Sequence, residues 1–320
     1  MTTVDENSRL AGVDPTSRRD VWLKKLVYPM HTVPTALAPV VVGVGLAAGD
    51  DVFALRSALV VFLFGWLVQL GGVLADNYFN LVRYHDDAEH PALVYAVDNG
   101  VIELGEIKRV TVAVFVLAAL VATYLVAVGG VPVIVVGVAS VAVSVFYSLE
   151  LTDVPLHDLY FFLFFGPISV GGTYYMQAVS HLPVSFPTWL PLGTLPLAVV
   201  AAGVPVGAIT AAILVVDNVR DLEFDREKAD LTLAVVIGER WSRVEFDALL
   251  ALAYLMPPVL SLWTDLGPWV LLPLLSLPYA AVVRRQWARA HTYSELLPMS
   301  PRTGRFLVLY SVLLAVGCWL

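Results

Sequence analysis

The chain has 320 residues, of which 58% are hydrophobic and only 14% are charged. Soluble globular proteins carry about 25% charged residues, so this composition argues against a soluble protein and for one that resides in a lipid bilayer. The net charge of −8 gives no sign of a nucleic-acid partner. Because Cys318 is the sole cysteine, an internal disulfide is excluded and a cysteine-based metal site is disfavoured.

The apolar residues fall into blocks long enough to cross a membrane. A helix needs about 20 apolar residues to span the hydrocarbon core, and the period-two alternation of barrel strands is absent. Residues 1–25 are predicted to form a cytoplasmic N-terminal tail, and residues 26–320 a single transmembrane domain. The predicted fold is all-α, with about nine transmembrane helices near 27–48, 53–77, 108–128, 131–148, 158–178, 195–217, 244–264, 267–284 and 304–320.

The positions of Lys and Arg predict the orientation of these helices. Apart from Arg56, every Lys and Arg lies in the N-terminal tail or in the loops that follow the second, sixth and eighth predicted helices. Cytoplasmic segments of membrane proteins are enriched in Lys and Arg. The long loops 78–107 and 218–243 are therefore expected on the cytoplasmic side of the cell membrane, and long loops in compact proteins are often functional.

A polar motif ends the second predicted helix. Asp76 and Asn80 are one helical turn apart and would share a face, and the acidic pair Asp86 and Asp87 follows. Asp76 and Asn80 are candidate catalytic residues and metal ligands, and the acidic pair adds further candidate ligands. Asn77 and Arg83 lie in the same stretch, and if the bound ligand is a diphosphate, these two residues are candidate contacts for it.

A second polar motif ends the sixth predicted helix. Asp217, Asp221 and Asp225 are spaced by four residues and would stack on one helical face. Asp217 and Asp221 are the candidate catalytic residues of this motif, and all three are candidate metal ligands. Candidate diphosphate contacts are Asn218, Arg220 and Asp225.

Two acidic motifs at helix ends point to a bound cation. Ionisable groups at membrane depth cost about 2.5–3.5 kcal/mol each on insertion scales, so such clusters need compensation. Carboxylate and amide oxygens suit Mg²⁺, which characteristically joins one or two protein carboxylates to substrate phosphates. One such motif alone would be read as a solvated helix end, but the two together favour a site for Mg²⁺ and a diphosphate.

Both motifs and two further stretches are similar to those of a known enzyme family. The segment from Asp217 to Asp225, continued by Thr232-Leu233-Ala234-Val235, matches that family's second motif closely, and Asp76-Asn77-Tyr78-Phe79-Asn80 matches its Asn-Asp-Tyr-Phe-Asp motif. Residues 31–40 and 164–175 match its first and fifth helices more weakly. Over nearly its whole length the chain resembles the UbiA superfamily of intramembrane prenyltransferases, and it looks most like the dihydroxynaphthoate prenyltransferase (MenA-like) branch.

The resemblance implies nine helices around a central cavity, with the two motifs facing each other over Mg²⁺ and a prenyl diphosphate. It implies ionisation of the allylic diphosphate, followed by attack of an electron-rich acceptor on the resulting cation. The expected cofactor is Mg²⁺, and the expected partners are a prenyl diphosphate, an aromatic acceptor and the lipid bilayer. Because the family typically has a Tyr followed by a Lys after the fourth helix, Tyr147 becomes a further candidate diphosphate contact.

The chain departs from the family pattern at several positions. Asp and Asn are exchanged within the first motif, between Asp76 and Asn80, and Asp217 stands where the family has Asn. No Lys follows Tyr147, and the stretch 228–232 lacks one of the family's basic residues. These changes put two expected diphosphate contacts in doubt.

Three functions are compatible with this pattern. The first is an aromatic prenyltransferase of quinone biosynthesis. The alternative is a terpene cyclase on the same scaffold, which ionises a prenyl diphosphate and cyclises it without an acceptor. A transporter is disfavoured because the acidic residues lie at the helix ends and not near the midplane, where transporter sites are usually found.

Overall fold

The structure is a computed structural model that describes residues 13–27, 33–83, 91–148, 155–228 and 231–320. Within these ranges the chain is helical and contains no strand, as predicted. The longer helices are α3 (Val33–Gly49), α4 (Leu55–Arg83), α6 (Leu104–Ser148), α8 (Ser169–Val179), α9 (Leu197–Arg220), α12 (Glu239–Trp263), α13 (Leu277–Trp287) and α15 (Met299–Trp319). The shorter elements are α2 (Arg18–Asp20), η1 (Val21–Val27), α5 (Pro91–Asp98), α7 (His157–Leu163), η2 (Phe164–Ile168), α10 (Leu222–Lys228), α11 (Leu233–Ile237), η3 (Pro268–Ser276) and α14 (Tyr293–Leu296).

Each predicted apolar segment coincides with helical structure, although four of the segments do not form a single regular helix of their own. The third and fourth segments form one element, α6, which is broken at Gly130 (φ 64°, ψ −149°). A Cβ atom there would lie 2.0 Å from the carbonyl oxygen of Pro187, so glycine is required both for the backbone angle and for the close approach. The fifth segment is built from α7, η2 and α8, and the eighth from η3 and α13.

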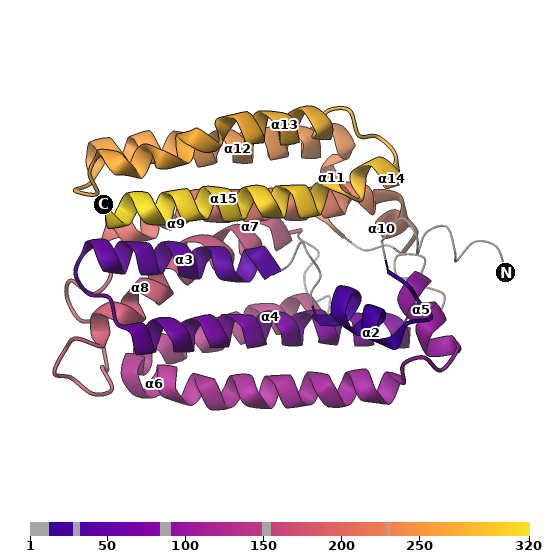
Figure 1. Cartoon of the computed structure of the whole chain (residues 1–320), viewed down its shortest axis with the longest axis horizontal. Helices are drawn as coiled ribbons and strands as arrows, with labels where there is room; N and C mark the ends of the chain where they lie inside the picture. Colours follow the sequence, from indigo (N-terminus) through magenta and orange to yellow (C-terminus); the bar gives the residue numbers. More distant parts are fainter. Residues whose placement is uncertain (1–12, 28–32, 84–90, 149–154, 229–230) are drawn as a thin grey trace.

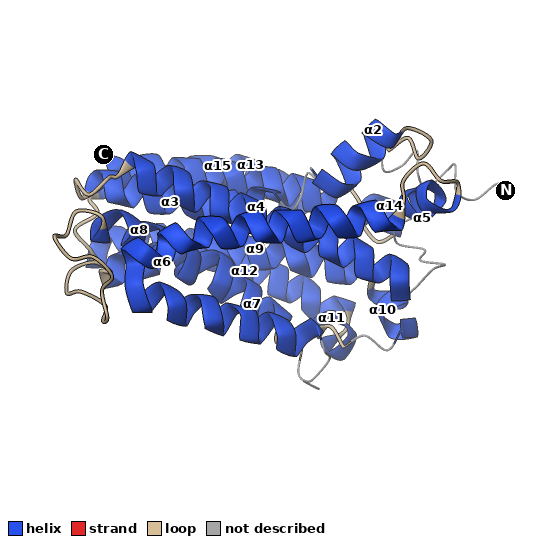
Figure 2. Cartoon of the chain, turned by 90° about the horizontal axis from the view of Figure 1, so that it is seen from below, coloured by secondary structure: helices blue, strands red, loops and turns tan. Residues whose placement is uncertain are grey.

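The long helices run side by side along one axis of the molecule (Figure 1). The short helices α2, α5, α10, α11 and α14 gather at one end of this bundle, which we call the capped end (Figures 1 and 2). The loop that joins α8 to α9 lies at the opposite end. The capped end is the end that the distribution of Lys and Arg predicts to be cytoplasmic.

Four of the described helices are long and apolar enough to cross a membrane: α4, α6, α9 and α12. Their burial inside the protein differs widely. In the most apolar stretch, 78% of the residues of α9 are buried, compared with 22% for α4 and α6 and 28% for α12. The helix that carries the second motif is therefore surrounded by protein, whereas fewer than a third of the residues in the corresponding stretches of α4, α6 and α12 are buried.

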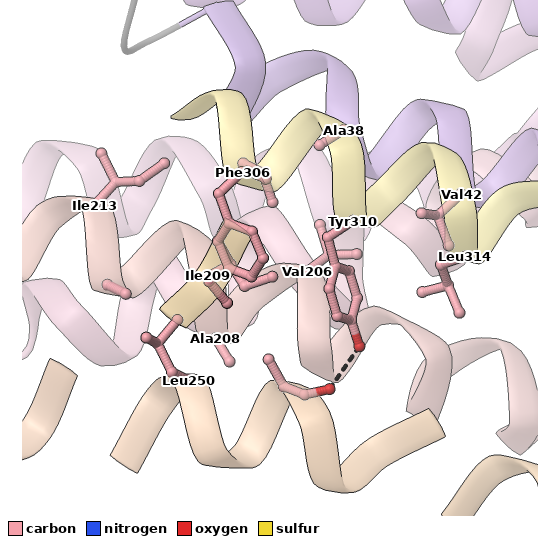
Figure 3. Close-up of a cluster of buried hydrophobic side chains, with 14 of the residues drawn as sticks. Ala38, Val42, Val206, Ala208, Ile209, Ile213, Leu250, Phe306, Tyr310 and Leu314 are labelled. Atoms are coloured by element: carbon pink, nitrogen blue, oxygen red, sulfur yellow. Dashed lines mark hydrogen bonds between the residues drawn. The ribbon is translucent and has the colours of Figure 1, made fainter. Parts of the chain in front are cut away.

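The core forms around α9. Side chains of α9 such as Val206 and Ile209 pack with Phe306 and Tyr310 of α15 (Figure 3). The buried Tyr310 hydroxyl donates a hydrogen bond of 2.5 Å to the carbonyl oxygen of Ala253 in α12, which ties the three helices together (Figure 3). Pairing this hydroxyl removes the cost of burying an unsatisfied polar group.

On its other side, α9 crosses the α7–η2 segment at very short range. A Cβ atom on Gly207 would lie 2.2 Å from the carbonyl oxygen of Phe162 and 3.1 Å from the Cα atom of Gly166. The missing side chains allow the two backbones to touch, so the position of α9 between its neighbours depends on these glycines.

Candidate functional site

The first motif occupies the last two turns of α4. The helix continues to Arg83, so the prediction that Asp76 and Asn80 share a helical face is confirmed. Asp76 is exposed and Asn80 half-buried. Asn77 is 4% exposed, and its Nδ2 atom donates to the carbonyl oxygen of Val73 at 2.7 Å. Its Oδ1 atom is buried and has no hydrogen-bond partner among the described residues.

The second motif spans the end of α9 and the start of α10. The α-helical conformation breaks at Asp221, yet the i to i−4 hydrogen bonds continue through the break. The Asp221 N–H donates to the Asp217 carbonyl at 3.0 Å, and the Asp225 N–H donates to the Asp221 carbonyl at 2.9 Å. The three carboxylates therefore remain about one turn apart, as the spacing predicted, and Asn218 is buried beside them.

Arg220 links two of these carboxylates. Its Nη1 atom lies 2.5 Å from Oδ1 of Asp217, and its Nε atom lies 2.8 Å from Oδ1 of Asp221. The Nη2 atom makes a second contact with Asp221, so this pair is bidentate. One cation thus compensates two carboxylates in a mostly buried setting, where such pairs are strong only if the hydrogen bonds are well formed.

Two hydroxyl groups that sequence reasoning missed also support this motif. Ser300, in the first turn of α15, donates from Oγ to Oδ1 of Asp217 at 2.6 Å. Thr232 donates to Oδ2 of Asp225 at 3.3 Å and caps α11. Thr232 lies in the stretch similar to the family's second motif, which could have signalled it. Ser300 carries no sequence signal, because it is far from both motifs along the chain.

A pocket of about 420 Å³ opens beside the second motif at the capped end. It is built by α9, α10, α12 and the segment around α14, and it contains no residue of α4. It is therefore distinct from the cavity predicted to lie between the two motifs. Its lining residues are Val219, Arg220, Asp221, Leu222, Glu223, Phe224, Glu239, His291, Tyr293 and Leu296.

The wall of this pocket around α14 is fixed by polar contacts. Arg243 of α12 donates to the carbonyl oxygens of Trp287, the last residue of α13, and Ala290, just beyond that helix, at 2.7 and 2.5 Å. The Glu295 carboxylate accepts from the backbone N–H groups of His291 and Thr292, and these contacts lower the pKa of Glu295. The segment between α13 and α15 is thereby held next to the end of α9.

The two motifs lie at the same end of the bundle. The C-terminal ends of α4 and α9 both point to the capped end (Figure 1), and α3 packs against both helices. Asp86 and Asp87 lie outside the described residues, as do the side chains of Arg83 and Tyr147.

The donor atoms that are present suit a hard cation. The carboxylates of Asp217, Asp221 and Asp225 and the amide oxygen of Asn77 are oxygen ligands of the kind that Mg²⁺ prefers. No three His, Cys, Asp or Glu side chains in the described ranges form a group that could hold a metal by themselves. Because Mg²⁺ usually takes only one or two protein carboxylates and completes its shell with water and substrate phosphates, this donor set fits an ion that binds together with a diphosphate.

Sequence comparison supports the resemblance inferred from the motifs. Residues 36–319 match the UbiA prenyltransferase family. The chain is 28% identical over 313 residues to the 1,4-dihydroxy-2-naphthoate octaprenyltransferase of Escherichia coli, which covers 95% of this chain and 96% of that protein. It is also 28% identical to the protein of the same name from Mycobacterium tuberculosis, with 89% and 92% covered.

Solved structures share the fold. The apo structure of a UbiA homologue from Aeropyrum pernix aligns with a TM-score of 0.64 at 14% identity, over 90% of this chain and 97% of that one. A structure described as giving insights into digeranylgeranylglyceryl phosphate synthase in membranes aligns with a TM-score of 0.54 at 13% identity. At these identities the likeness concerns the fold alone. Because the family match extends over most of the chain and the fold agrees with it, the chain belongs to the UbiA prenyltransferase family and is an integral membrane prenyltransferase.

Proposed function

We propose that this protein is a Mg²⁺-dependent enzyme of the cell membrane that transfers a prenyl group from an isoprenoid diphosphate to an aromatic acceptor in quinone biosynthesis. The observation that carries the proposal is the buried cluster of Asp217, Arg220 and Asp221 at the end of α9. The names of the two bacterial relatives support an acceptor similar to dihydroxynaphthoate.

In the proposed reaction, the C–O bond of the allylic diphosphate breaks, and the diphosphate leaves with the bonding electron pair. A ring carbon of the acceptor forms the new C–C bond, and the group displaced from that carbon leaves without its bonding electrons. Mg²⁺, when bound, would neutralise negative charge that develops on the leaving diphosphate. Burial of the site would keep water from capturing the allylic cation.

The proposed metal ligands come from both motifs. Asp217 and Asp221 would hold the ion from α9, with Asp225 as a further ligand. Asp76 and Asn80 would contribute from α4, followed along the chain by Asp86 and Asp87. Asp217, Asp221, Asp76 and Asn80 are the residues on which we expect turnover to depend most.

The proposed diphosphate contacts surround these ligands. Arg220 presents a planar fork of N–H donors, which matches phosphate oxygens as well as carboxylates. The amides of Asn77 and Asn218 can donate to the remaining oxygens. The other proposed contacts are Asp225 through the metal, Arg83 and Tyr147.

The proposed orientation places the capped end in the cytoplasm. Residues 1–25 would be a cytoplasmic tail and residues 26–320 one transmembrane domain. The soluble head of the diphosphate would then approach from the cytoplasm, while its apolar tail lies among the helices or in the bilayer.

The deciding experiment incubates the purified protein with geranylgeranyl diphosphate and Mg²⁺, with and without dihydroxynaphthoate. Transfer predicts a prenylated aromatic product that requires both the acceptor and Mg²⁺. The altered first motif, with Asp76 and Asn80 exchanged relative to the family, is the feature that favours cyclisation as the alternative. Release of diphosphate with a hydrocarbon product in the absence of acceptor would replace transfer by cyclisation.

A further inference from the structure

Among the described residues, the hydrogen bonds to the Asp217 carboxylate all fall on one of its two oxygens. Within the described residues, Oδ1 accepts from Ser300 Oγ at 2.6 Å and from Arg220 Nη1 at 2.5 Å. Two donors of this kind account for the usual acceptor capacity of one carboxylate oxygen. The oxygen that these contacts leave for another positive group is Oδ2.

Asp221 is held differently. Both of its oxygens contact the same guanidinium, Oδ1 through Nε of Arg220 and Oδ2 through Nη2. If Arg220 turned toward a bound diphosphate, it would withdraw donors from both carboxylates. Asp217 would keep its contact with Ser300, which is neutral and belongs to a different helix.

Ser300 is well placed for such a lasting contact. It is 0% exposed and lies in the first turn of α15, a helix that packs against α9. A buried hydroxyl has no water to exchange with, so its hydrogen bond to a carboxylate persists as long as the two helices stay packed.

We propose that Ser300 is a positioning residue that holds Asp217 through Oδ1 and thereby directs Oδ2 toward the metal–diphosphate complex. This inference rests on the proposed function, because it takes Mg²⁺ and a diphosphate as the ligands of the site. Groups that orient a metal ligand typically change metal affinity about 10–100-fold when they are removed.

The test measures binding of Mn²⁺, used as a spectroscopic stand-in for Mg²⁺, to the purified full-length protein in the presence of inorganic diphosphate. Electron paramagnetic resonance of the free ion gives the affinity without turnover. Ser300→Ala should weaken Mn²⁺ binding about 10–100-fold. Ser300→Thr, which keeps the hydroxyl, should bind Mn²⁺ more tightly than Ser300→Ala. In turnover, the Mg²⁺ concentration for half-maximal rate should rise by a similar factor in Ser300→Ala.

Ser311→Ala is the matched control. Ser311 lies in the same helix and is 1% exposed, but its Oγ atom has no hydrogen-bond partner among the described residues. Its replacement should leave Mn²⁺ affinity unchanged. Equal losses in Ser300→Ala and Ser311→Ala would overturn the positioning role, because they would report a general effect of replacing a buried serine.

Asp217→Asn separates failure of this inference from failure of the proposed function. If Asp217→Asn weakens Mn²⁺ binding but Ser300→Ala binds like the wild type, the positioning role falls and the metal site stands. If the wild type shows no diphosphate-dependent Mn²⁺ binding, or if Asp217→Asn does not alter it, the metal role of Asp217 falls together with the role of Ser300.

Discussion

The two helices that carry the motifs, α4 and α9, are almost equally apolar but are buried to very different extents. Their most apolar stretches have mean hydropathies of 2.2 and 2.4, yet 22% of the residues are buried in α4 and 78% in α9. Lipid tails and a protein core are both apolar. High hydropathy therefore indicates that a helix is removed from water, but it does not indicate whether lipid or protein surrounds that helix.

The motifs at the ends of these helices differ in the same way. Asp217 on α9 accepts from Arg220 in the same helix and from Ser300 on α15, so it is held before any ligand arrives. On α4, Asp76 is exposed, whereas Asp221 and Asp225 are buried. We infer that the second motif provides the more deeply buried half of the site. A metal site requires that the side chains that bind the metal are themselves held in place by contacts with neighbouring residues.

The largest expected effect tests the buried position of α9. Gly207→Val should prevent stable folding, because its Cβ atom would lie 2.2 Å from the carbonyl oxygen of Phe162. Overpacking typically costs about 1–3 kcal/mol, and a clash with backbone belongs at or above the upper end of that range. The measurement is the yield and thermal stability of the protein in detergent. Gly72→Val is the control, because a Cβ atom on that exposed glycine of α4 meets nothing within 4 Å. Equal stability of the two variants would contradict the contrast between the helices.

The next largest effect concerns the acidic residues of α9. Asp217→Ala and Asp221→Ala should each lower Mg²⁺-dependent turnover by roughly 100-fold or more, because each removes a charge that stabilises the metal and the leaving diphosphate. Glu227→Ala, an exposed acidic change on the neighbouring α10, should leave turnover near the wild-type rate. Size-exclusion profiles and prenyl diphosphate consumption are measured for all three variants. Turnover of either Asp variant near the wild-type rate would remove that residue from the site.

A smaller effect is expected in the first motif, where Asp76 is exposed to solvent. Asp76→Asn should lower turnover about 10–100-fold by removing the charge from this part of α4, and Asn80→Ala should have a milder effect. The double change Asp76→Asn with Asn80→Asp restores the family's order of residues one helical turn apart. It should recover turnover above that of Asp76→Asn alone, since neighbours in one site are coupled.

The same consumption assay decides whether Asp76 belongs to the site. A nearly silent Asp76→Asn, with a double variant that equals the sum of its single changes, would mean that Asp76 is a solvated residue at the helix end. Metal binding by the first motif would then depend on other residues, such as Asp86 and Asp87 in the loop 78–107.

The smallest expected effect on activity comes from changes that report only orientation. Glu227→Cys lies at the capped end, and Trp189→Cys lies in the loop at the opposite end, where Trp189 is 84% exposed. The native Cys318 is buried, so background labelling should be low. A membrane-impermeant maleimide applied to intact cells should label Trp189→Cys and should reach Glu227→Cys only after permeabilisation. The reverse result would invert the proposed topology.

Much of the fold could be predicted from local features of the sequence. Apolar blocks located the helical segments, and the positions of Lys and Arg grouped loops that do lie at one end of the bundle. The four-residue spacing of Asp217, Asp221 and Asp225 placed their carboxylates about one turn apart, because helical geometry relates residues that are close in the chain. The break at Gly130 falls between the third and fourth predicted helices, 108–128 and 131–148, where the sequence indicated a connection but not that both helices belong to one element.

Only the tertiary structure decided which helix is central and which groups support the motifs. Nothing in the composition of α4 and α9 indicates which of the two is enclosed by other helices. Ser300 and Asp217 are 83 residues apart, and their hydrogen bond exists because α15 packs beside α9. Periodicity describes neighbours within a few turns of one helix, whereas a contact between helices depends on how all of them pack. This is the physical reason that the sequence determined the motifs, with Arg220 among their residues, but not the support that Ser300 gives from another helix.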